Sequence, residues 1–189
     1  MALVSVCIAV LLAVPILVGF SPAQAQSAAY NYTPHTEVEL DYVMALTRLQ
    51  RCTTPAGALD AYAKGLMTRN GVLLALVSPL ERQEELTSQM IQNSQTSGGR
   101  AYYVSPGAEL NGLATSGAYV IYNVTPQGED CYEALLALPM AAFSTTDWSA
   151  LPQNGQEVIS GGGFVVIPVA VSLQDGWVVE EHAPRQFFP

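Results

Sequence analysis

Glu180 and His182 are the titratable side chains whose spacing could support chemistry, because residues two apart in a β-strand lie on the same face. Asp175-Gly176 is typical of a two-residue hairpin turn, and that turn would pair Val171 with Glu180 and Val169 with His182. Paired residues share a face, so the acid would lie among apolar side chains. An acid in such a setting can have a raised pKa and act as a general base.

The same residues have a simpler interpretation. Strands fray near a chain end, and two adjacent acids are usually solvated. We therefore predict no catalytic residue and treat Glu180, His182, Tyr62 and Trp177 as candidate ligand-pocket residues. Tyr62 and Trp177 could supply hydrogen-bond donors beside the acid. An enzyme would require that the acid project into a closed pocket.

Other motifs do not indicate catalysis or a metal. The glycine-rich segment from Ser160 to Gly163 precedes a predicted strand, so it lacks the helix N-terminus that binds phosphate. The chain has no Gly-x-Ser-x-Gly motif, and its two histidines lack the spacing of metal ligands. The sequence therefore predicts neither a cofactor nor a metal site.

Residues 1–25 are typical of a signal peptide. Ala2–Phe20 is an apolar run without charge, and Ala23-Gln24-Ala25 suits a signal peptidase. The first basic residue is Arg48, whereas a signal peptide usually begins with a basic segment, so a retained membrane anchor is the alternative. Both hypotheses place the rest of the chain outside the cytoplasm, either secreted or tethered to the membrane. Residues 26–35 would be a linker.

Charge and cysteine content support an exported domain. The chain has 16 acidic and 7 basic residues, and a net charge of −9 argues against nucleic acid as a partner. Cys7 lies in the leader, which leaves Cys52 and Cys131 as the only pair in the exported part. Disulfides persist in that compartment, so we predict a Cys52–Cys131 bridge, with two buried thiols as the alternative.

Helical periodicity comes before strand periodicity in the chain. Helices are expected from Glu37 to about Cys52, from Pro55 to Asn70-Gly71 and, after an apolar piece at 72–77, from Leu80 to about Asn93. Strands are expected at 101–105, 118–125, 131–138, 164–173 and 177–182. This order favours one α+β domain over residues 36–183, with N-terminal helices packed on a curved antiparallel sheet and a tail at 184–189.

The order of elements resembles the nuclear transport factor 2-like, or cystatin-like, cone fold of exported bacterial proteins. The resemblance rests on two segments: Thr54–Tyr62, which opens a predicted helix, and Asp175–Val179, which forms the turn and the start of the last predicted strand. It implies an apolar pocket on the concave face of the sheet, and it transfers no catalytic residue.

Three functions are compatible with the sequence. We favour a non-enzymatic domain that binds a small ligand or a protein partner at the cell envelope. One alternative is an isomerase-like or cyclase-like enzyme with an acid in the cone pocket. The other is a structural module that forms homodimers through its sheet.

Overall fold

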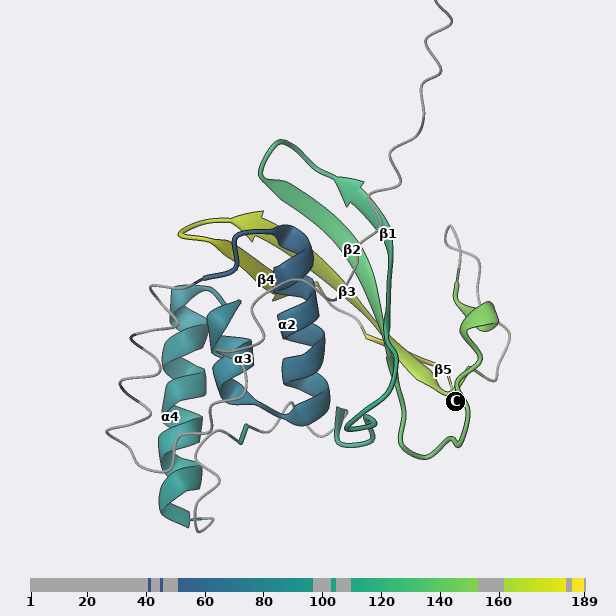
Figure 1. Cartoon of the computed structure of the whole chain (residues 1–189), viewed down its shortest axis with the longest axis horizontal. Helices are drawn as coiled ribbons and strands as arrows, with labels where there is room; N and C mark the ends of the chain where they lie inside the picture. Colours follow the sequence, from purple (N-terminus) through teal and green to yellow (C-terminus); the bar gives the residue numbers. More distant parts are fainter. Residues whose placement is uncertain are drawn as a thin grey trace, which may run out of the picture.

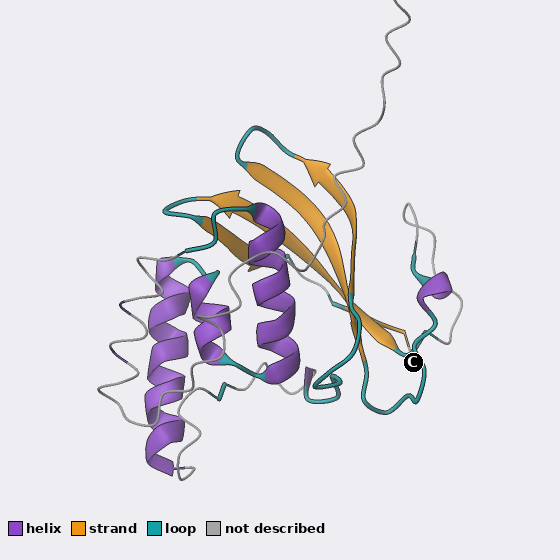
Figure 2. Cartoon of the chain, viewed as in Figure 1, coloured by secondary structure: helices purple, strands orange, loops and turns teal. Residues whose placement is uncertain are grey.

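The computed structural model describes Asp41, Ala45 and residues 51–96, 103–104, 110–152, 162–182 and 185–188. Within these residues the protein is an α+β domain whose α-helices lie on one side of an antiparallel sheet, while the short 3-10 helix η3 (Trp148–Ala150) lies toward the other side (Figures 1 and 2). The predicted α+β class and the order of helices before an antiparallel sheet are confirmed. The predicted leader and linker lie outside the described residues, and of the helix predicted from Glu37 the structure describes Asp41 and Ala45, both helical. Among the described helices, none is both long and apolar enough to span a membrane.

Local sequence signals set the start of helix α2 (Pro55–Thr68). The Thr54 side chain accepts a hydrogen bond from the Gly57 N–H at 3.1 Å, and Pro55 occupies the first helical position, where its lack of an N–H costs nothing. The helix ends at Arg69, which adopts the left-handed conformation with φ of 55°.

Asn70 begins the next helix rather than ending α2. Its side-chain oxygen accepts hydrogen bonds from Val72 and Leu73, the second and third residues of helix α3 (Gly71–Leu76). The prediction that Asn70-Gly71 closes α2 was wrong for this reason, and the short apolar piece predicted at 72–77 is mostly helical.

Helix α4 (Leu80–Thr96) is joined to the end of α3 by a buried glutamine. The Gln83 amide Nε2 donates to the Ala75 carbonyl at 2.7 Å, which satisfies one of the carbonyls left unpaired where a helix ends. Contact between α2 and α3 is close because Gly65 has no side chain: a Cβ there would lie 2.8 Å from the Leu74 side chain.

The sheet has the order β1-β2-β3-β4, in which all neighbours are antiparallel. Its strands are β1 (Val120–Pro126), β2 (Cys131–Pro139), β3 (Phe164–Leu173), β4 (Trp177–Glu181) and the short β5 (Gln186–Phe188). Strand β5 also pairs with β3, so part of the predicted tail at 184–189 belongs to the sheet. Of the strand predicted at 101–105, the structure describes Tyr103 and Val104, and Tyr103 forms an isolated bridge with Asn70.

Pro168 lies inside β3, on the edge that pairs with β4 and β5, at a position where its missing N–H breaks no hydrogen bond of the sheet. Strand β4 pairs with residues 169–173 of β3 and β5 pairs with residues 164–166, so Pro168 falls in the gap between them. Its carbonyl accepts from the His182 N–H at 2.9 Å on that same edge. The opposite edge of β3 therefore keeps a continuous ladder with β2.

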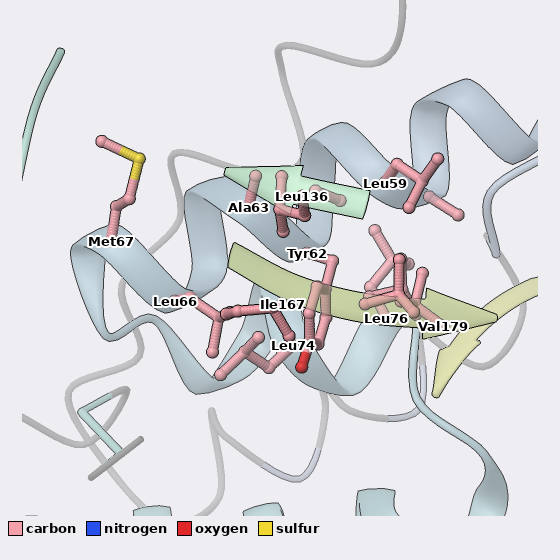
Figure 3. Packing of buried hydrophobic residues seen from close by; sticks show 14 of the residues in the cluster. Leu59, Tyr62, Ala63, Leu66, Met67, Leu74, Leu76, Leu136, Ile167 and Val179 are labelled. Carbon is pink, nitrogen blue, oxygen red and sulfur yellow. The ribbon is translucent and has the colours of Figure 1, made fainter. Parts of the chain in front are cut away.

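The main core lies between α2 and the sheet. Alternate residues of β2 and β3 point toward the helices and pack with the apolar face of α2, as Figure 3 shows for Leu136, Ile167 and Leu59. The other face carries a smaller cluster around Phe164 and Val166. There the Trp148 ring stacks on Phe164 with centroids 5.8 Å apart.

The β3–β4 hairpin has a three-residue loop, not the predicted two-residue turn. Leu173 pairs with Trp177 and Val169 pairs with Glu181, which is one residue out of the predicted register. Gly176 adopts a φ of +124°, and a Cβ there would lie 2.4 Å from the Arg51 Cβ, so the loop depends on glycine. Because a slip of one residue exchanges the faces of a strand, Glu181 rather than Glu180 shares the face of Val169.

The structure contains no disulfide between Cys52 and Cys131. Cys52 is buried in the main core on the helix side of the sheet. Cys131 alternates with Tyr132, whose ring packs against that core, so the Cys131 side chain lies on the opposite face. The predicted bridge is therefore not formed, because the sheet separates the two thiols.

Candidate functional site

A pocket of about 400 Å³ lies where β4 meets the three helices. Its apolar lining includes one residue from each of α2, α3, α4, the segment after α4 and β4: Leu66, Leu74, Leu86, Val104 and Val179. Figure 3 shows Leu66, Leu74 and Val179 within one cluster of side chains. The polar side chains of the pocket come from α2, the start of α4 and the end of the chain, so the pocket joins segments that are distant in the sequence.

Backbone contacts hold these segments in place. The Val179 N–H donates to the Val77 carbonyl at 2.7 Å, which fixes the outer edge of β4 against the loop that follows α3. In that loop the Ser78 hydroxyl donates to the Leu74 carbonyl at 2.7 Å. The position of β4 relative to the helices is therefore set by hydrogen bonds as well as by packing.

Tyr62, Glu181 and Arg185 form a hydrogen-bonded group at the pocket. The Tyr62 hydroxyl donates to Glu181 Oε1, and Arg185 donates to Glu181 Oε2 from Nε at 2.9 Å and from Nη2 at 2.6 Å. Tyr62 is only 6% exposed. Burial, and then the nearby Glu181 charge, raise the pKa of Tyr62 well above its ordinary value. The tyrosine therefore remains a hydrogen-bond donor at neutral pH.

Two further charged residues border the pocket. Arg82, near the start of α4, forms an ion pair with Glu85, and both side chains are about half exposed. Glu180 is exposed and forms no ion pair or hydrogen bond with any residue that the structure describes. Glu180 alternates along β4 with Val179 and Glu181, which face the helices, so its side chain leaves the strand on the opposite face.

The four predicted pocket residues do not all meet. Tyr62 and Glu180 are both among the residues that line the first pocket. Trp177 instead packs in the core, with its ring centroid 5.7 Å from that of Tyr132. His182 lines a second, smaller pocket of about 270 Å³ on the sheet.

Sequence reasoning did not identify three charged residues of the pocket. Glu181 was placed on the wrong face by the register error. Arg185 was assigned to a tail, although it lies beside Glu181. Arg82 gave no signal beyond a charge on a predicted helix. A correct hairpin register would have identified Glu181, whereas the two arginines depend on tertiary packing.

A second polar cluster lies on α2, away from the pocket. Asp60 is 7% exposed, accepts from Lys64 Nζ at 2.8 Å and also accepts from the Tyr119 hydroxyl. Burial, and then these interactions with Asp60, raise the pKa of Tyr119. The cluster ties α2 to the segment before β1, a structural role that accounts for all three side chains.

The described residues contain no group of three histidine, cysteine or acidic side chains that could hold a metal. Comparison of the chain with protein-family models, curated proteins and solved structures gives no match. The argument for function therefore rests on the pocket itself.

Proposed function

We propose that the chain is a non-enzymatic extracytoplasmic domain that binds a small ligand in the pocket between α2, α4 and β4. The observation that carries this proposal is the composition of the pocket, which combines apolar side chains from five segments with a few polar groups at about 400 Å³. Small-molecule sites typically occupy roughly 300 to 1,000 Å³ and have this kind of lining. The pocket lies on the helix side of the sheet, where the resemblance to the cone fold implies a ligand site.

Two features favour binding over catalysis. Both Glu181 oxygens already accept hydrogen bonds, so neither is directed at a substrate. Glu180 is exposed rather than enclosed among apolar groups. The isomerase or cyclase alternative requires an enclosed acid with an unengaged oxygen, and neither glutamate provides one.

The cellular setting is part of the same proposal. It is supported by the apolar segment Ala2–Phe20 and the Ala-Gln-Ala site that follows it. The net charge of −9 supports a partner other than nucleic acid. On this view residues 26–189 act at the cell envelope, whether or not Ala2–Phe20 remains as a tether.

Methyl NMR of the exported chain during a small-molecule screen tests the proposal. Ligands should shift the methyl signals of Leu66, Leu74 and Val179, which line the pocket. Val166 lies on the opposite face of the sheet and should not respond, so it is an internal control. The proposal fails if no compound shifts the pocket methyls more than Val166. Recovery of a chemically altered compound would instead support the enzyme.

A further inference from the structure

We infer that the pocket prefers ligands in which a carboxylate is attached to an apolar group. This inference rests on the proposed function and adds the ligand's charge to it. The apolar part of such a ligand would contact Leu66, Leu74 and Val179, and its carboxylate would lie near Arg82 at the start of α4. Alkyl and aryl carboxylates have this chemistry.

Arg82 lies on the side of α4 that faces the pocket. It is four residues from Leu86, so the two side chains occupy neighbouring positions on one face of the helix, and both residues line the pocket. Its charge also acts on the tyrosine of the pocket. Burial, and then the Glu181 charge, raise the pKa of Tyr62, whereas the charges of Arg185 and Arg82 oppose that rise. Both guanidinium groups are therefore close enough to influence a charge that forms beside the Tyr62 hydroxyl.

The charged side chains at the pocket leave a surplus of positive charge. Arg82, Arg185 and Glu181 carry their charges there, while the Glu180 side chain leaves β4 on the opposite face. Glu181 already accepts hydrogen bonds at both oxygens, so it offers a cation no unengaged oxygen. The start of α4 also borders the pocket, and a helix carries a partial positive charge at its N-terminus. Charge complementarity therefore favours a carboxylate over an ammonium group.

The ion pair that Arg82 makes within α4 leaves it able to bind a ligand. Its Nη1 donates to Glu85 Oε2, and both side chains are about half exposed. An exposed pair three residues apart on one helix contributes little to stability, because water competes for both charges. Within the described part of the chain the Arg82 guanidinium has no other hydrogen-bond acceptor. A ligand carboxylate can therefore accept from its remaining N–H groups or replace Glu85.

Three probes that share one alkyl chain test this inference: octanoate, octanol and octylammonium. We expect octanoate to bind about fivefold more tightly than octanol, which is the upper range for an ion pair at a solvent-accessible site. Octylammonium should bind most weakly, because its charge would lie near the two guanidinium groups. Affinities can be measured from the pocket methyl shifts at neutral pH, where octanoate is ionised.

Three substitutions on α4 separate the charge of Arg82 from the net charge of the chain. In Arg82→Gln, octanoate should bind no more tightly than octanol. In Glu85→Gln, which removes the partner of Arg82, the preference for octanoate should rise about twofold, the scale of an ion pair within a helix. Glu84→Gln is the matched control, because Glu84 is an exposed acid of α4 that does not line the pocket, and its loss changes the net charge by the same amount. That control should keep the preference of the unaltered chain.

The possible failures are distinguishable. Tightest binding of octanol or octylammonium overturns the inference and leaves the proposed function intact. The inference is also wrong if Arg82→Gln keeps the preference, or if Glu85→Gln and Glu84→Gln change it equally. It is wrong as well if other screened compounds shift the pocket methyls and none of the octyl probes does. If no compound of any kind shifts those methyls, the proposed function itself fails.

Discussion

Tyr62→Phe removes one hydroxyl from the pocket and leaves the aromatic ring in place. The hydroxyl donates to Glu181 Oε1, and hydrogen bonds to charged groups contribute about 1.5 to 3 kcal/mol. Glu181 would keep both hydrogen bonds from Arg185, and its side chain is 27% exposed, so water can replace part of the loss. The lower end of the range therefore applies, and we expect the free energy of unfolding to fall by about 1.5 kcal/mol at neutral pH.

Urea denaturation followed by circular dichroism measures this change. Tyr132→Phe is the matched control, because Tyr132 packs against Trp177 and its hydroxyl has no hydrogen bond to a described residue. The control should cost less than about 0.5 kcal/mol. A double-mutant cycle of Tyr62→Phe with Glu181→Gln should give a coupling energy of about 1 kcal/mol.

Equal losses in Tyr62→Phe and Tyr132→Phe would refute the reasoning. So would additivity of Tyr62→Phe and Glu181→Gln, since additive changes mean that the two side chains do not interact. Either result would show that Glu181 is not held by Tyr62, and the description of the pocket's charged groups would have to change.

Three other predictions follow from single features of the fold. Burial raises the pKa of Tyr122 to about 12, so the unfolded chain loses its tyrosine protons at lower pH than the folded chain. The free energy of unfolding should therefore fall as pH rises above about 10, and it should fall less steeply in Tyr122→Phe. Denaturant titration across that pH range measures both changes. Gly176→Ala should lower the melting temperature more than Gly128→Ala: both glycines have positive φ, but a Cβ at Gly176 meets Arg51 whereas one at Gly128 meets no atom within 4 Å. Maleimide should label Cys131 in the folded protein and Cys52 only after unfolding, as peptide mass spectrometry would show, because Cys52 is 1% exposed; equal labelling rates would contradict the described burial.

Local sequence signals were sufficient to predict several helices and strands. The Thr54-Pro55 pair predicted the start of α2, and the predicted strand at 164–173 coincides with β3. In both cases the deciding interactions lie within a few residues of the element, as in a side-chain cap or an alternating apolar pattern. Such interactions are visible in a single sequence.

The hairpin register was not predictable in this way. Asp175-Gly176 is compatible with a two-residue turn, but the Trp177 N–H donates to the Cys52 carbonyl and the Leu173 N–H donates to the Asp130 carbonyl. These hydrogen bonds reach outside the hairpin and stabilise the three-residue loop instead. The turn type is thus decided by tertiary contacts, which local turn preferences do not contain.

The register in turn determines which acid faces the pocket. Tyr62 and Glu181 are 119 residues apart in the sequence, and they meet because Glu181 lies on the helix side of β4. In the register predicted from the sequence, Glu180 and His182 would take that side and Glu181 would turn away from Tyr62. The group of Tyr62, Glu181 and Arg185 would then not form. Gly176, which allows the observed loop, therefore influences which acid faces the pocket as well as the stability of the fold.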